Sequence, residues 1–180
     1  MSKKTTEKKN SPLKLVNADA PEIVSIDRTA DLKALLEENI KCLYWVENHL
    51  VKALPKMVSA AGRPELRQAF SEHLSITVGH VARLEQVFEL LGKKILAKKS
   101  DALEGLAMDG EHIIEETMAG SDARNTGLIM AGQLVENYEI TAYTGVIKLA
   151  TQLGLSEIAD ILSKTLAEEQ EAENRLRSLA

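Results

Sequence analysis

Four long segments of this chain carry apolar residues at steps of three and four, and this spacing places them on one face of an α-helix. A shorter segment, from Ser100 or Asp101 to near Gly120, has a similar pattern. Aromatic residues make up 3% of the chain and Leu, Ala, Ile and Val supply most of its apolar side chains, so we predict an all-α fold. The four long helices are expected over about residues 27–61, 64–91, 121–153 and 156–180.

The connections between these helices restrict the topology more than their number does. Gly62 and Pro64 leave only a tight turn between the first two helices, and Gly154 marks a similar turn between the last two. Each of these pairs must therefore form an antiparallel hairpin. A much longer connection, residues 92–120, joins the hairpins and contains the short helix. A four-helix bundle with one long crossover has the ferritin-like topology.

Several residues predict where the helices begin and end. Asp27 or Thr29 can cap the first helix and Ser156 the last. Pro55 is expected to kink or weaken the last turn of the first helix. Residues 1–26 have no helical period and contain two prolines, so they are predicted to be a flexible N-terminal tail. The folded domain is then expected to span residues 27–180.

Composition excludes some classes of function. The formal net charge is −5, so no overall positive field attracts nucleic acid or an anionic membrane. No apolar run approaches the roughly 20 residues that a membrane-spanning helix needs. Cys42 is the single cysteine, which excludes an intrachain disulfide and suits the reducing cytoplasm. We therefore expect a cytoplasmic protein without nucleic-acid or membrane partners.

Four glutamates lie where an apolar side chain is expected. Glu47, Glu136, Glu139 and Glu169 each fall in the middle of the apolar stripe of a predicted helix, and His80 lies on the stripe of another. An isolated carboxylate in a low-dielectric core costs several kcal/mol or takes up a proton. The usual remedies are a cationic partner or a metal ion. A metal site inside the bundle is therefore the first hypothesis.

The hairpin geometry places these side chains at similar heights. Counting outward from the turn near residues 63–64 puts Glu47 level with His80, and counting from Gly154 puts Glu139 level with Glu169. Glu136 lies about one helical turn from Glu139. That layout allows carboxylates to bridge two metal ions. We predict that iron or manganese is bound by Glu47, His80, Glu136, Glu139 and Glu169.

Measured against known di-iron carboxylate bundles, the ligand set is incomplete. Those bundles use one Glu from each of two helices and Glu-x-x-His from the other two. Here Thr77 occupies the position of the glutamate in the second helix, and Ala172 occupies the position of the histidine in the last. The pair Glu136-x-x-Glu139 supplies an additional acid. The residues indicate metal binding and do not specify a catalytic reaction.

Neighbouring polar residues have two interpretations each. His73 is interpreted first as a hydrogen-bonded core histidine and second as a ligand. Glu168 could replace the missing histidine but fits a solvated face better. Tyr44 and Tyr143 could each donate a hydrogen bond to a ligating carboxylate, or be ordinary core tyrosines. Arg83 is expected to point outward, away from the carboxylates.

Five stretches of the sequence carry a resemblance to a known family: LVKALPKM (50–57), HVARLEQVFELLGKK (80–94), ALEGLAMDGEHII (102–114), QLVENYEITAYTG (133–145) and LAEEQEAENRL (166–176). They resemble the YciE/YciF-type ferritin-like family of bacterial stress-associated proteins. The resemblance covers about residues 31–179 and implies a helical bundle, a homodimer and a dinuclear metal site. Members commonly carry acids at the positions of Ser75 and Ile76, and a histidine at that of Asn137; we expect Ile76 to face inward beside His80.

Two classes of function follow from the sequence. The first is a ferritin-like stress protein that binds iron or manganese and handles peroxide or dioxygen. The second is a metal-free helical bundle that serves as a scaffold or a dimeric binding module, with a vestigial site. The four acids favour the first class, whereas Ile76 and Ala172 favour the second.

Overall fold

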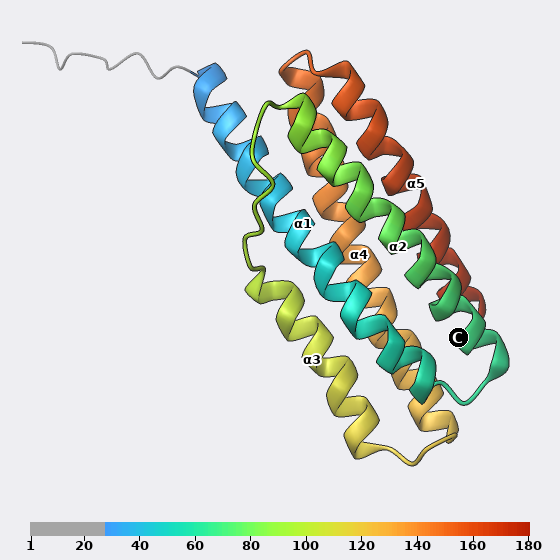
Figure 1. Cartoon of the computed structure of the whole chain (residues 1–180). Coiled ribbons are helices and arrows are strands. Elements are labelled where there is room, and N and C mark those ends of the chain that lie inside the picture. The colour runs from blue at the N-terminus through green and yellow to red at the C-terminus, as the bar shows by residue number, and fades with distance from the viewer. Residues whose placement is uncertain (1–27) are drawn as a thin grey trace, which may run out of the picture.

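The computed structural model describes residues 28–180, and every regular element in that range is an α-helix (Figure 1). The predicted tail, residues 1–26, and the predicted cap Asp27 lie outside the described residues. The predicted all-α fold is confirmed. The helices are α1 (Arg28–Ala60), α2 (Pro64–Leu90), α3 (Asp101–Glu116), α4 (Asp122–Gln152) and α5 (Ser156–Ser178).

Side-chain caps and glycines set several helix ends. The hydroxyl of Ser100 accepts a hydrogen bond from the amide of Leu103 at the start of α3. Gly154 has a φ of 71°, the left-handed conformation that lets the chain leave α4 and turn into α5. The expected cap at Ser156 is wrong: Leu155 takes the N-cap position, without a side-chain hydrogen bond. The first helix continues through Pro55 as far as Ala60.

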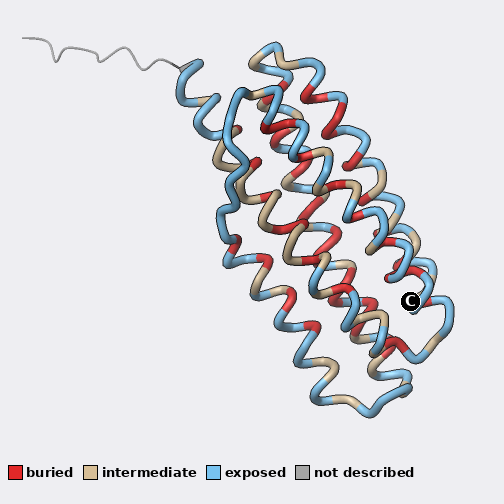
Figure 2. The backbone as a smooth tube through the Cα atoms, viewed as in Figure 1, coloured by how far each residue is buried: buried red, intermediate tan, exposed pale blue. Residues whose placement is uncertain are grey.

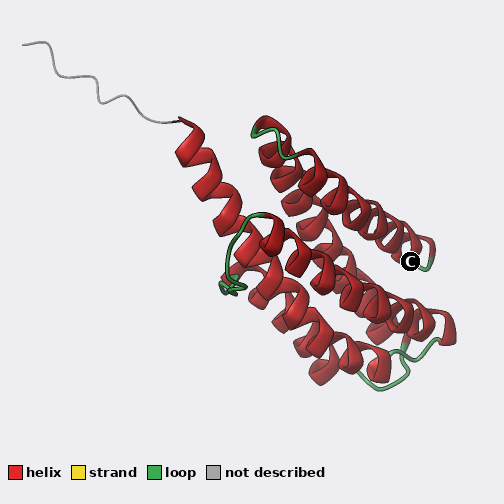
Figure 3. Ribbon diagram, turned by 45° about the horizontal axis from the view of Figure 1, so that its top comes forward, coloured by secondary structure: helices red, strands yellow, loops and turns green. Residues whose placement is uncertain are grey.

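The helices assemble as two antiparallel hairpins, α1–α2 and α4–α5, joined by the crossover that contains α3 (Figures 1 and 3). Helix α3 packs mainly against α4, outside the four long helices. The C-terminus lies beside the α1–α2 turn, where the Arg63 guanidinium donates a hydrogen bond of 2.8 Å to the carbonyl of Leu179. This arrangement is the predicted ferritin-like four-helix bundle with one long crossover.

Buried residues lie along the inward faces of the helices (Figure 2). The apolar ones among them form two clusters rather than one. One cluster surrounds Phe88 and Tyr143 near the α4–α5 turn, and the other surrounds Phe70 and Leu128 near the α1–α2 turn. The helix segments between the clusters bring a layer of buried polar side chains into the core. That layer contains Glu47, His73, Thr77, His80, Glu136, Glu139, Thr165 and Glu169.

Two of the three glycines inside α4 allow a neighbour to approach closely. A Cβ atom on Gly127 would lie 2.7 Å from Ile113 Cγ2, and one on Gly132 would lie 2.8 Å from Leu176 Cδ1. Gly145 was expected to do the same and does not, because nothing lies within 4 Å of its Cβ position. Within residues 28–180, no helix has the length and apolar character needed to span a membrane.

Candidate metal centre

Each of the four long helices contributes at least one buried ionisable side chain to the polar layer. These side chains enter the core because they occupy stripe positions on helices whose remaining stripe residues are apolar. Almost none of their surface reaches solvent: the largest exposed fraction is 6%, at His73. The residues are Glu47 on α1, His73 and His80 on α2, Glu136 and Glu139 on α4, and Glu169 on α5.

These side chains form two groups, each of which offers its ligand atoms within 4.8 Å of one another. The first group is His73, Glu136, Glu139 and Glu169. The second is Glu47, His80 and Glu169. Glu169 belongs to both groups, so one carboxylate joins two adjacent sets of possible metal ligands. The five residues predicted from the sequence thus lie together, while their role as ligands stays a prediction.

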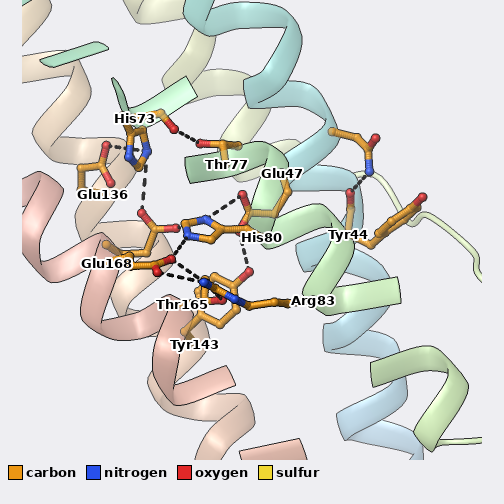
Figure 4. A network of polar contacts seen from close by, with 12 residues as sticks. Tyr44, Glu47, His73, Thr77, His80, Arg83, Glu136, Tyr143, Thr165 and Glu168 are labelled. Atoms are coloured by element: carbon orange, nitrogen blue, oxygen red, sulfur yellow. Dashed lines mark hydrogen bonds and ion pairs between the residues drawn. The ribbon is translucent and has the colours of Figure 1, made fainter. Parts of the chain in front are cut away.

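The atoms at the centre are close together but are not aligned for hydrogen bonding. His80 Nδ1 lies 3.4 Å from Glu47 Oε2 (Figure 4) and 2.9 Å from Glu169 Oε1. None of these three atoms has a hydrogen-bond partner in the described part of the chain. Among residues 28–180, the other buried side-chain atoms without a hydrogen-bond partner are His73 Nδ1, Glu136 Oε2, Glu169 Oε2 and both carboxylate oxygens of Glu139. Buried polar groups are rarely left this way. Carboxylate oxygens that converge in this way can be neutralised by a cation, either a metal ion or a protonated histidine.

Burial and mutual repulsion raise the pKa of three of the carboxyl groups. Burial raises the pKa of Glu139 and of Glu136 well above the ordinary value, and the negative charge of Glu169 adds to the effect in both cases. Burial also raises the pKa of Glu47. Without a cation, the protein therefore favours protonated carboxyl groups here. A metal ion would reverse this preference by stabilising the anions.

The two histidines respond to the same surroundings in opposite directions. Burial lowers the pKa of His73. Burial acts on His80 in the same sense, but the carboxylates of Glu169 and Glu47 outweigh it and raise the pKa of His80 to about 10. In the metal-free protein His80 is therefore the positive charge that partly neutralises Glu169. The pKa of Glu169 is lowered because His80 and His73 outweigh the effect of its own burial.

A second carboxylate contacts His80 from outside the cluster. Glu168 Oε2 lies 2.8 Å from His80 Nε2, and the Arg83 guanidinium donates to both oxygens of Glu168, at 2.5 and 2.8 Å (Figure 4). Arg83 was expected to point outward and Glu168 to be solvated; both are half-buried at the edge of the bundle and form an ion pair with each other. A carboxylate on the far nitrogen of a ligating histidine fixes the orientation of the ring. Nδ1 then faces the centre.

Two tyrosines were predicted to donate a hydrogen bond to a candidate ligand carboxylate; Tyr143 does, and Tyr44 does not. The Tyr143 hydroxyl donates a 2.5 Å hydrogen bond to Glu47 Oε1, and both side chains are fully buried. Tyr44 instead donates to the exposed Glu85, at 3.0 Å. The difference follows from helix geometry. Tyr143 lies on the inward stripe of α4, one turn beyond Glu139, whereas Tyr44 is at the edge of the α1 stripe.

The structure also changes the roles of three residues on α2. His73, first interpreted as an ordinary core histidine, belongs to the larger ligand group, and its separation of seven residues from His80 was the available signal. Ile76 was expected to face inward, but 38% of its surface is exposed. Thr77 is buried, and its hydroxyl donates to the carbonyl of His73 instead of pointing at the carboxylates.

Fold and site together define a ferritin-like helical bundle with a buried carboxylate and histidine cluster at its centre. A family model described as "Domain of unknown function (DUF892)" matches residues 31–180. The chain belongs to this family, and the predicted resemblance to YciE/YciF-type proteins is confirmed.

Individual relatives agree with the family assignment. Protein YciF from Escherichia coli (strain K12) is 39% identical over 138 residues, which cover 76% of this chain and 82% of that protein. The crystal structure of the E. coli stress protein YciF superposes with a TM-score of 0.78 at 35% identity, covering 82% and 93% of the two chains. YcfI from Rhodopseudomonas palustris, provisionally described as a structural protein, superposes with a TM-score of 0.79 at 32% identity, covering 83% and 94%.

Proposed function

We propose that this protein is a cytoplasmic, metal-binding member of the bacterial stress response that holds two iron or manganese ions in its bundle. The observation that carries the proposal is the membership of Glu169 in both ligand groups. Glu47, His80 and Glu169 would hold one ion, and His73, Glu136, Glu139 and Glu169 the other. When bound, such ions supply redox chemistry that the side chains alone cannot.

The charges and the donor types fit two divalent ions. The two groups contain four different carboxylates, whose four negative charges balance two doubly positive ions. Carboxylate oxygens with one imidazole for each ion suit manganese and ferrous iron, which prefer oxygen and nitrogen donors. A metal pair would also give partners to the buried atoms that have no hydrogen bond.

The role in stress is supported by the relatives. E. coli YciF is described as a stress protein, and this chain matches most of its length. The comparison supports the biological setting of the proposal, while the carboxylate cluster supports its chemistry.

We also propose that the protein forms a homodimer through α4. Between Arg124 and Lys148 the charged residues of α4 are Glu136 and Glu139, and both are buried. The outward face of this stretch therefore carries no charge. It exposes Met130 and Leu134, at 60% and 52%. Interface cores are depleted of charged residues and enriched in methionine, which matches this face.

Metal loading tests the central proposal. Protein incubated anaerobically with ferrous iron or with manganese, then desalted, is expected to retain about two ions per chain by elemental analysis. Glu169→Gln should lose most of this metal because the carboxylate that joins the two groups is gone. Glu157→Gln, an exposed site on the same helix, is the matched control and should bind like the wild type.

Thermal stability gives an independent measurement. At free metal about 100 times Kd, binding stabilises the folded state by about 2.7 kcal/mol. For a chain of this size that corresponds to an increase in Tm of roughly 5–10 °C. Less than one ion per chain, together with an unchanged Tm, would exclude the metal proposal.

The second candidate is a metal-free scaffold or dimeric binding module. Ala172, where di-iron bundles have a histidine, and the description of R. palustris YcfI favour it. The two candidates differ in one measurable property. If the protein is a scaffold, Glu139→Leu should raise its stability, because an apolar side chain replaces a buried acid. If it is a metalloprotein, the same change should abolish the increase in Tm that metal produces.

A further inference from the structure

A pocket of about 150 Å³ between α2 and α5 reaches the candidate metal centre from the surface. His73 and Glu136, both more than nine-tenths buried, form its inner end. A cavity of this size accommodates a molecule as large as benzene. The pocket is therefore large enough for an organic molecule, and not only for water.

The walls of this pocket are largely apolar. Phe70, Ile76, Ala172 and Leu176 line it between the surface and the inner end. Ala172 matters most, since di-iron bundles place a metal-binding histidine at its position. In this chain the methyl group of Ala172 leaves room where that imidazole would project.

The inner end carries polar atoms that have no hydrogen-bond partner. His73 Nδ1 and Glu136 Oε2 are both buried and unpaired. One end of a ligand can therefore be polar, while the remainder contacts apolar side chains. Such an amphipathic pocket binds molecules with one oxygen-bearing end and a short alkyl group.

The charges around the pocket select against anions. Four acids line it, Glu72, Glu136, Glu168 and Glu171, against one cationic side chain, Arg175. Arg175 already forms an ion pair with Glu72, and Glu168 is paired with Arg83. No free positive charge in this lining remains to bind a carboxylate or a phosphate.

We propose that this pocket binds a small neutral organic molecule whose hydroxyl or hydroperoxyl end lies at His73 and Glu136 and whose alkyl group packs on Phe70, Ile76 and Leu176. Where the metal ions are concerned, the inference rests on the function proposed above, since the oxygen end would then lie beside the ion held by His73 and Glu136. The binding of the molecule itself does not require metal.

Binding can be measured on the metal-free full-length protein with tert-butanol as the probe. Titration of methyl-labelled protein by NMR should shift the methyl signals of Ile76 and Leu176 and leave exposed Ile95 unchanged. A Kd of roughly millimolar is expected for a ligand of so few atoms. Pivalate, which has the same shape with a carboxylate, should bind at least tenfold more weakly.

Two pairs of variants locate the site. Ala172→Leu fills the pocket and should weaken tert-butanol binding at least tenfold, whereas Ala167→Leu, at an exposed position of the same helix, should change it less than twofold. If Ala172→Leu does not fold, as judged by circular dichroism, Ile76→Trp replaces it, with exposed Val78→Trp as its control. The absence of saturable shifts, equal binding of pivalate, or equal effects of a variant and its control would overturn the proposal.

Further measurements separate this proposal from the metal proposal. In protein shown by elemental analysis to contain manganese, the methyl protons of bound tert-butanol should relax faster because the paramagnetic ion is close. Binding without faster relaxation would overturn the placement of the oxygen end beside the metal. If the protein binds tert-butanol but takes up no metal, the pocket proposal stands and the metal proposal is excluded. Tenfold tighter binding of tert-butyl hydroperoxide than of tert-butanol assigns the pocket to hydroperoxides, and equal affinities show that it accepts both classes.

Discussion

The imidazole of His80 lies between two adjacent residues of α5: its Nδ1 is 2.9 Å from Glu169 Oε1, and its Nε2 is 2.8 Å from Glu168 Oε2. Adjacent residues on a helix point about 100° apart, so one carboxylate enters the core while the other stays at its edge. The edge residue is fixed by Arg83. Glu168 therefore orients His80, although Glu168 itself lies outside the group that His80 forms with Glu47 and Glu169.

Glu168→Gln should therefore weaken metal binding without removing a ligand. An amide holds the His80 ring less strongly than a carboxylate does, and loss of such an outer partner typically lowers metal affinity about 10–100-fold. Competition with a chromophoric chelator measures the effect. Glu157→Gln, exposed on the same helix, is the control. A wild-type affinity in Glu168→Gln would show that this carboxylate does not orient the histidine.

The metal-free protein should lose stability as the pH rises above neutrality. The raised pKa of His80, about 10, provides stability that is fully present below about pH 6.5 and is lost as the pH rises through 10. Glu136 and Glu139 act in the same direction, because their pKa values are raised and ionisation disfavours the folded state. The Tm should fall by several degrees between pH 6 and pH 9.5.

Two comparisons test the origin of that pH dependence. Glu139→Gln, which stays neutral at every pH, should make the fall in Tm smaller. Manganese-loaded protein should show little fall, since the ions keep the carboxylates paired. Identical pH profiles for wild type and Glu139→Gln would contradict the assignment.

Tyr143→Phe should destabilise the protein by about 1–3 kcal/mol, because a buried Glu47 oxygen loses its hydrogen-bond donor. Tyr44→Phe removes a hydroxyl that donates to the exposed Glu85, and a change within about 0.5 kcal/mol is expected. Urea denaturation of both variants gives the comparison. Equal losses would mean that the tyrosine at the centre contributes no more than the one at the surface.

Leu134→Glu should convert the proposed homodimer into a monomer. The substitution places a charge in the uncharged outer face of α4, where it would be desolvated by the second copy. Sedimentation velocity at micromolar concentration measures the oligomeric state. The matched control is Leu96→Glu, which changes an equally exposed leucine in the crossover. A wild type that sediments as a monomer would exclude the dimer.

Connection lengths were enough to predict the topology, because a tight turn leaves two adjacent helices no arrangement but an antiparallel one. The height of side chains across a hairpin could also be predicted, since helical rise is constant. Accordingly, Glu47 Oε2 lies 3.4 Å from His80 Nδ1. The exact rotation of each helix about its own axis could not be predicted. This rotation decides whether a residue at the edge of the apolar stripe is buried. Ile76, Arg83 and Glu168 lie there, and a small rotation decides between core and solvent.

His73 shows a second reason why part of the site escaped prediction. A single histidine on an apolar stripe is usually a packed core residue, and the sequence gives no information on which side chains of other helices surround it. Its neighbours Glu136 and Glu169 come from α4 and α5, so the contact depends on how the two hairpins pack together. Turn lengths do not determine that packing.

The two apolar clusters of the core are separate from the polar layer that forms the candidate metal centre, so folding and binding depend largely on different side chains. Phe88 on one side of the polar layer, and Phe70 and Leu128 on the other, belong to separate clusters in which apolar side chains pack against one another. Mutations in the polar layer can therefore accumulate across generations while both ends of the bundle persist. Selection can thus alter the polar layer in one lineage after another without inventing a new architecture.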